Sequence, residues 1–144
     1  MSHPPNCVGL ILAGAVLSLR FGMGAADVVT VVSSKSAVTT LSKNQVADIF
    51  LGKSNRFPDG EQATPIDQPE SSSAREQFYN KVTGKSLAQL KAHWSKIIFT
   101  GRGQPPKMVM NSVEVKKLLA DNPSAIGYID DTQVDTTVRV LSTP

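Results

Sequence analysis

Residues 71–78, Ser-Ser-Ser-Ala-Arg-Glu-Gln-Phe, combine the residue types in this chain that are best suited to chemistry. They follow a short β-type segment at residues 63–67 and open a helical pattern. A helix N-terminus has free backbone N–H groups and a partial positive charge, so this turn could hold an oxyanion. The alternative is structural: Ser73 caps the helix, and Glu76, three residues later, completes a capping box.

Arg102 is a second candidate for anion contact, because it lies between Gly101 and Gly103. Flanking glycines let the backbone approach a ligand, and the guanidinium offers a planar pair of donors to an oxyanion. A flexible surface loop explains the same three residues equally well.

Enzymatic chemistry has little support in the sequence. His93 is the only histidine after His3, and no nucleophile or metal partner is placed beside it, so a solvated or packing role is favoured. Asp130 and Asp131 could bind a cation, but adjacent acids at a strand end usually form a polar turn. The sequence contains no Gly-x-Ser-x-Gly or His-Glu-x-x-His motif. We therefore expect a non-enzymatic protein without a cofactor or metal.

The first 26 residues differ in composition from the rest of the 144-residue chain. An apolar run at residues 7–19 has the length of a signal-peptide core, and small residues follow it up to Ala26. We expect a signal peptide at 1–26 with cleavage after Ala26, and export to the periplasm. An uncleaved membrane anchor is the alternative.

Residues 27–144 have the length of one small domain and contain no cysteine, so a hydrophobic core must stabilise it. Their 14 basic and 12 acidic residues are too evenly balanced to imply binding to nucleic acid. Capping boxes at Ser42–Gln45 and Ser86–Gln89 mark two helix starts. The second helix is expected to bury Trp94, with Phe99 beside it in the core. The patterns predict strands near 28–33, 65–66, 125–129 and 137–141, and helices near 42–51, 73–82, 86–98 and 113–120.

Strands that alternate with helices predict an α/β domain, with a parallel or mixed sheet flanked by helices. Four segments in order also resemble the periplasmic phosphate-binding proteins of ABC transporters. Residues 41–53 are similar to the family pattern L-s-x-x-q-l-x-x-I-F-x-G-k, and residues 71–78 to G-S-G-T-R-E-x-F. Trp94 with the sequence at 99–101 fits the next family helix and its exit, and residues 122–129 fit N-P-G-A-I-G-Y-v.

The resemblance implies that residues 27–144 form one periplasmic-binding-protein-like lobe that binds a small anion, with phosphate the suspected ligand. A membrane transporter would be the partner. Family members have two lobes and about twice this length, and here Gln68 and Ala74 stand where the family has arginine and threonine. The alternative is a protein-interaction or sensory module without a ligand, which could form a homodimer. The ligand-binding residues that we expect are Ser71, Ser72, Ser73, Ala74, Arg75 and Arg102.

Overall fold

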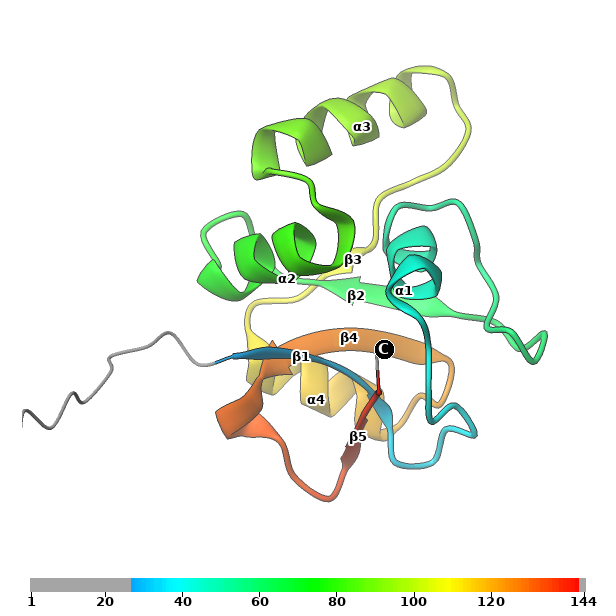
Figure 1. Ribbon diagram of the computed structural model, residues 1–144, viewed down its shortest axis with the longest axis vertical. Coiled ribbons are helices and arrows are strands. Elements are labelled where there is room, and N and C mark those ends of the chain that lie inside the picture. Colours follow the sequence, from blue (N-terminus) through cyan, green and yellow to red (C-terminus); the bar gives the residue numbers. More distant parts are fainter. Residues whose placement is uncertain (1–26, 143–144) are drawn as a thin grey trace, which may run out of the picture.

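Five strands form one sheet in the order β3-β2-β4-β1-β5 (Figure 1). The computed structural model describes residues 27–142, and the predicted signal peptide at 1–26 lies outside the described residues. β2 runs parallel to β3 and β4, whereas β1 runs antiparallel to β4 and β5, so the sheet is mixed, as predicted. The strands are β1 (Val28–Ser33), β2 (Thr64–Asp67), β3 (Lys107–Met108), β4 (Ala125–Asp130) and β5 (Val138–Val140).

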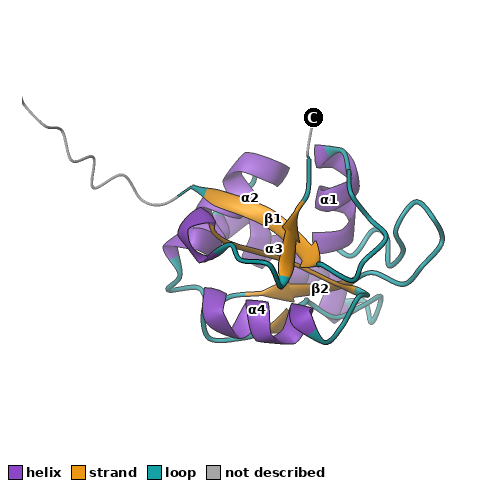
Figure 2. Ribbon diagram, turned by 90° about the horizontal axis from the view of Figure 1, so that it is seen from below, coloured by secondary structure: helices purple, strands orange, loops and turns teal. Residues whose placement is uncertain are grey.

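Helices cover both faces of the sheet (Figure 2). Neighbouring residues of a strand point to opposite faces, so Val32 packs with α1 (Lys43–Phe50) and α2 (Ser73–Thr83), and Val31 packs with α4 (Ser112–Ala120). α3 (Leu87–Phe99) adds an outer layer on the α1–α2 side. No helix within residues 27–142 is long and apolar enough to cross a bilayer.

Two apolar clusters lie within the described residues, one on each face of the sheet. Gly127 of β4 allows α4 to pack closely, because a Cβ at this position would lie 2.6 Å from Val115 Cγ1. The whole sheet and both clusters are contained in residues 27–142, so we expect residues 27–144 to fold without the preceding segment.

Within residues 27–142, side-chain caps start the α-helices α1, α2, α3 and α4. The predicted capping boxes at Ser42 and Ser86 are confirmed. The predicted cap at Ser73 is wrong, because the α2 N-cap is Ser72, whose Oγ accepts the Arg75 N–H at 3.4 Å. Ser72 has an extended backbone, with φ −75° and ψ 121°, whereas Ser73 is already helical. A serine at the first helical position cannot accept from the third residue after it in the manner of a cap.

The packing of α3 against the domain differs from the prediction at the C-terminal end of the helix. Leu90 and Trp94 are buried in the core, and the His93 Nε2–H donates to the carbonyl oxygen of Leu51 at 2.8 Å. Phe99, which we expected in the core, is 92% exposed, because it lies on the opposite face of the helix from Leu90. β3, which follows two prolines, was not predicted from the sequence.

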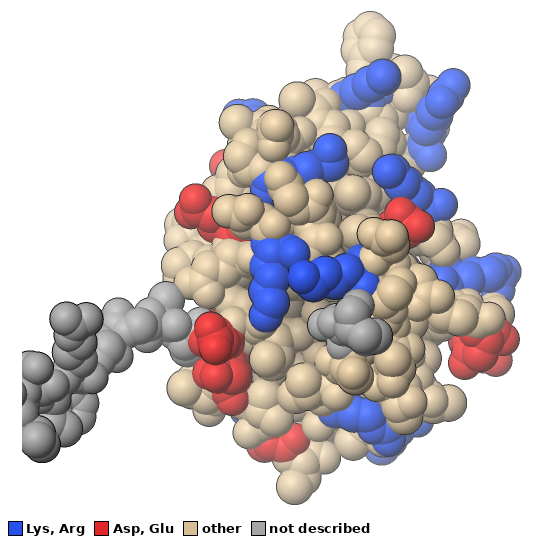
Figure 3. Space-filling model, in the orientation of Figure 1, with Lys and Arg blue, Asp and Glu red and all other residues tan. Residues whose placement is uncertain are grey.

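Charge is unevenly distributed along the described chain. Residues 77–113 contain six lysine or arginine residues and no acidic residue, whereas the rest of residues 27–142 contains twelve acidic and eight basic residues. In Figure 3 the end of the molecule that α3 forms shows basic and uncharged side chains, and the acidic groups in view lie lower. The segment that contains α3 is therefore the basic part of the domain.

Candidate functional site

A buried carboxylate lies at the end of β2, immediately before the serine-rich turn. Asp67 accepts a hydrogen bond from the Tyr79 hydroxyl at 2.7 Å through Oδ2, and another from the Tyr128 hydroxyl through Oδ1. The backbone N–H of Gln68 also donates to Oδ1, at 2.8 Å. Asp67 therefore faces the core, and its charge does not point toward an anion at the turn.

Arg75 pairs with this carboxylate instead of extending toward the serines. Its Nε lies 3.4 Å from Asp67 Oδ1, and its guanidinium carbon lies 5.3 Å from the centre of the Tyr79 ring. Burial, and next the adjacent negative charge of Asp67, raise the pKa of Tyr79 and Tyr128 far above the ordinary value. Both tyrosines therefore remain neutral hydrogen-bond donors to the carboxylate.

Gln68 fixes the turn between β2 and α2. Its Nε2 donates to the Tyr128 carbonyl oxygen at 2.9 Å, and its Oε1 accepts from the Ser72 hydroxyl at 3.0 Å. The single hydrogen of the Ser72 hydroxyl is thus already donated within the protein. Ser72 positions the turn, and a ligand must find its donors among the neighbouring groups.

A hollow of about 490 Å³ lies where the N-termini of α2 and α4 meet. The sequence-predicted serines and Ala74 come together here, beside the start of α4, which was not among the predicted site residues. Asp130 and Gln133, at and after the end of β4, complete the wall. The lining residues are Gln68, Ser71, Ser72, Ser73, Ala74, Met110, Asn111, Ser112, Val113, Asp130 and Gln133.

Unpaired backbone donors adjoin this hollow from both helices. Within the part of the chain that the structure describes, the N–H groups of Ser73 and Ala74 have no acceptor, and neither do those of Ser112 and Val113. Such groups carry the partial positive charge of a helix N-terminus. Two helix N-termini therefore offer hydrogen-bond donors to one space.

Arg102 does not contribute to the hollow between α2 and α4. It lines a different hollow of about 270 Å³, together with Trp94 and Pro106. The lining of the α2–α4 hollow includes no lysine or arginine, and its one carboxylate is Asp130. The structure thus brings Ser71, Ser72, Ser73 and Ala74 together and leaves both predicted arginines elsewhere.

The start of α4 carried a signal in the sequence that we did not use. Asn111 is the N-cap, and its Oδ1 accepts the Glu114 N–H at 3.1 Å. The Asn-x-x-Glu spacing is typical of a helix start. Ser112 Oγ also accepts the Asp130 N–H at 3.3 Å, so the start of α4 is tied to the end of β4.

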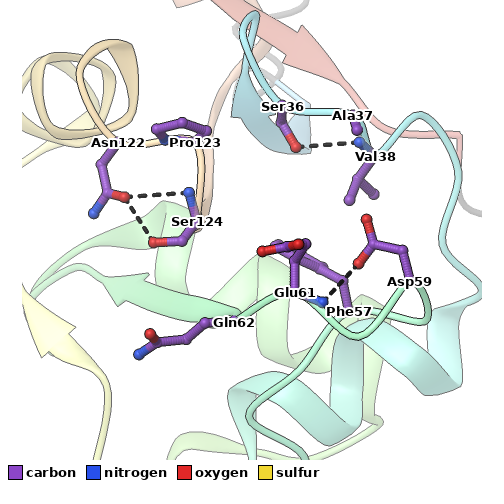
Figure 4. A pocket seen from close by; sticks show the side chains of 10 residues that line it. All are labelled: Ser36, Ala37, Val38, Phe57, Asp59, Glu61, Gln62, Asn122, Pro123 and Ser124. Carbon is purple, nitrogen blue, oxygen red and sulfur yellow. Dashed lines mark hydrogen bonds between the residues drawn. The ribbon is translucent and has the colours of Figure 1, made fainter.

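A second hollow, of about 460 Å³, is lined by the segment that follows β1 and by the segments that precede β2 and β4 (Figure 4). Asp59 and Glu61 bring two carboxylates to it and no basic side chain lines it, so an anion would be repelled. Local hydrogen bonds occupy several of its polar groups, including the Glu61 N–H, which donates to Asp59 Oδ1 at 2.9 Å. The lining residues are Ser36, Ala37, Val38, Phe57, Asp59, Glu61, Gln62, Asn122, Pro123 and Ser124.

The fold is similar to solved structures of phosphate transport proteins, although the sequence matches no family profile and no curated protein. A Clostridium perfringens protein assigned as a phosphate ABC transporter substrate-binding protein, with bound phosphate, has a TM-score of 0.65 at 20% identity, over 82% of this chain and 45% of its own. An ABC-type phosphate transport receptor from Vibrio cholerae has a TM-score of 0.65 at 19% identity, and the match covers 82% of this chain and 46% of the receptor. PstS from Borrelia burgdorferi has a TM-score of 0.58 at 16% identity, and the match covers 82% of this chain and 47% of PstS.

These similarities show the α/β fold, which matches that of periplasmic binding proteins. The match with this chain covers less than half the length of each of these proteins. Two of them are described as a phosphate ABC transporter substrate-binding protein and a phosphate transport receptor.

Proposed function

We propose that this chain is a non-enzymatic binding domain that holds one small oxyanion, phosphate first among the candidates, in the hollow between α2 and α4. The observation that carries the proposal is the meeting of two helix N-termini at one space lined by serine side chains. Helix N-termini bind anions through their free N–H groups and their dipoles. The fold similarity to phosphate transport proteins supports the same ligand class.

In the proposed mechanism the ligand accepts hydrogen bonds from the backbone N–H groups of Ser73 and Ala74 on one side, and of Ser112 and Val113 on the other. The hydroxyl of Ser71 lies at the same wall and can donate as well. Without an arginine in the lining, affinity rests on neutral donors, which bind an anion less strongly than a charge-assisted pair does. We therefore expect weaker binding than an arginine-containing site would give.

Removing one backbone donor tests the site directly. Ser73 is the first residue of α2, where proline is tolerated, and Ser72 before it already has the extended backbone that proline requires. Ser73→Pro therefore deletes the N–H and keeps the helix start. We expect phosphate to bind residues 27–144 about tenfold or more weakly in this variant, measured by isothermal titration after refolding to remove carried ligand.

Ser73→Ala is the matched control, since it removes the hydroxyl and keeps the N–H. The alanine variant should retain most of the affinity lost by the proline variant. If folded wild-type protein gives no heat with phosphate, sulfate or small carboxylates, the anion proposal is wrong.

The carboxylate of Asp130 is expected to determine which oxyanions bind in the hollow. A carboxylate in the wall repels a fully ionised ligand, but it can accept a hydrogen bond from a ligand oxygen that carries a proton. Phosphate carries such a proton near neutral pH and sulfate does not. We expect Asp130→Asn to strengthen sulfate binding about tenfold relative to phosphate, with Asp131→Asn, which changes an exposed neighbour, as the control. Unchanged selectivity would remove Asp130 from the site.

The proposal extends to the place of action. A signal peptide at residues 1–26 would deliver the domain to the periplasm, where a membrane transporter would receive the ligand. N-terminal sequencing of protein recovered from the producing cell tests this point, since cleavage after Ala26 gives a chain that starts at Asp27.

The second candidate, a protein-interaction module without a ligand, is favoured by the rim of the hollow. Met110 and Val113 line it and are 75% and 43% exposed. Exposed apolar groups of this size occur at interaction surfaces. Absence of anion binding together with a concentration-dependent increase in mass would support this candidate, with a homodimer as the simplest assembly.

A further inference from the structure

The C-terminal end of α3 exposes apolar side chains that the fold does not use. Phe99 is 92% exposed and Ile98 is 55% exposed, and they are adjacent at the last turn of the helix. α3 forms the outermost layer of the domain, so this end projects from the body (Figure 1). Exposing a phenylalanine side chain to water is unfavourable, and exposed apolar side chains occur at sites that bind a protein or a membrane.

Basic residues lie close to this apolar end along the chain. Lys91 lies two helical turns before Ile98 on the same face, and Lys96 and Arg102 lie on either side of Phe99 in the sequence. All three are exposed, and none forms an ion pair within the described residues. The closest acidic residues in the sequence are Glu76 and Glu114, so the cations are not locally neutralised along the chain.

We propose that the end of α3 binds the surface of an anionic lipid bilayer. Phe99 and Ile98 would enter the headgroup region, and Lys91, Lys96 and Arg102 would contact lipid phosphates. Cationic side chains next to exposed aromatic and aliphatic residues are the combination that binds such surfaces, through apolar burial and electrostatic attraction together.

The shape of this end favours a lipid surface over an acidic protein. The two apolar side chains are exposed at the end of an outlying helix, whereas a specific protein partner usually requires a complementary packed surface. A fluid bilayer accepts a projecting side chain without such a surface. The end of α3 also lies away from the hollow between α2 and α4, so lipid binding leaves that site free.

The test is sedimentation of residues 27–144 with vesicles of phosphatidylcholine alone, and with vesicles in which about one third of the lipid is phosphatidylglycerol. The shorter chain is used because the apolar run at 7–19 would itself bind lipid. We expect binding to the anionic vesicles that weakens as salt is added, and little binding to the neutral ones. Failure to sediment with anionic vesicles overturns the proposal.

Two variants locate the contact. Phe99→Ser removes the apolar group, and Lys96→Glu with Arg102→Glu reverses two charges; each should weaken vesicle binding about tenfold or more. The matched controls change the same properties elsewhere: Val140→Ser alters an exposed apolar residue of β5, and Lys35→Glu with Lys117→Glu makes the same change in net charge. Equal losses in the control variants would mean nonspecific attraction, and would overturn the assignment to α3.

A fluorescent label reports the insertion itself. Residues 27–144 contain no cysteine, so Thr100→Cys accepts an environment-sensitive dye at one position beside Phe99. We expect a blue-shifted emission with anionic vesicles, abolished by Phe99→Ser. An emission change with an acidic polypeptide and none with vesicles would overturn the lipid assignment in favour of an acidic protein partner.

Discussion

Replacing Asp67 with asparagine lowers the free energy of unfolding by about 3–5 kcal/mol, because the change leaves a buried charge without its partner. The carboxylate accepts from two tyrosine hydroxyls and pairs with Arg75. An asparagine has one acceptor oxygen, and its NH₂ group faces donors. Urea unfolding followed by the fluorescence of Trp94, the only tryptophan, measures the loss.

Tyr79→Phe provides the scale for this measurement. It removes one hydroxyl donor and leaves Asp67 with Tyr128 and Arg75, so the expected loss is only about 1–2 kcal/mol. If Asp67→Asn costs no more than Tyr79→Phe, then the pairing with Arg75 does not stabilise the fold as the geometry indicates.

The second large effect is expected at alkaline pH. The chain contains only two tyrosines, and burial together with the charge of Asp67 raises the pKa of both in the folded protein. In the unfolded chain their pKa is close to 10. Stability is therefore fully present below about pH 10, and it decreases above that value because the unfolded chain releases protons that the folded chain retains.

Ultraviolet absorbance of tyrosinate and circular dichroism, recorded together as the pH is raised, test this prediction. We expect both signals to change in one transition, since the tyrosines ionise only when the protein unfolds. Tyr79→Phe should halve the tyrosinate amplitude. A tyrosinate signal that develops while the circular dichroism stays native would contradict the buried arrangement around Asp67.

The elements that the sequence predicted are those with a strong local cause. The β-branched run of β1 and the capping boxes at Ser42 and Ser86 need no distant partner, and all three appear in the structure. β3 has only two residues after two prolines, and it exists because β2 provides an edge to pair with. No local pattern encodes such a pairing.

The predictions were wrong where tertiary packing determines which of several neighbouring residues takes a role. Three consecutive serines could each cap α2, and Ser72 does so because Gln68, fixed by Tyr128, accepts its hydroxyl hydrogen. Phe99 follows Ile98 in an apolar run, but the helix places it on the solvent side. Local composition does not distinguish these outcomes.

The candidate site was predictable only in part for the same reason. Residues 71–74 form a recognisable turn, and the structure places them at the hollow. The partner helix start at Asn111 and the carboxylate of Asp130 come from distant positions, brought together by the parallel pairing of β2 with β4. Arg75 was predicted to bind the ligand because its buried partner, Asp67, is recognised only when Tyr79 and Tyr128 are placed.

The strand order also determines when the domain can fold during its synthesis. β1 has its two neighbours at the far end of the chain, with Val28 opposite Asp130 and Val31 opposite Val140. Until the ribosome has made that far end, β1 has no edge to pair with and one face of its apolar residues stays uncovered. Pairings between distant segments also form slowly. Residues 27–142 are therefore expected to remain unfolded until β4 and β5 have been synthesised. An unfolded chain is the state that secretion machinery needs if it is to thread a polypeptide across a membrane.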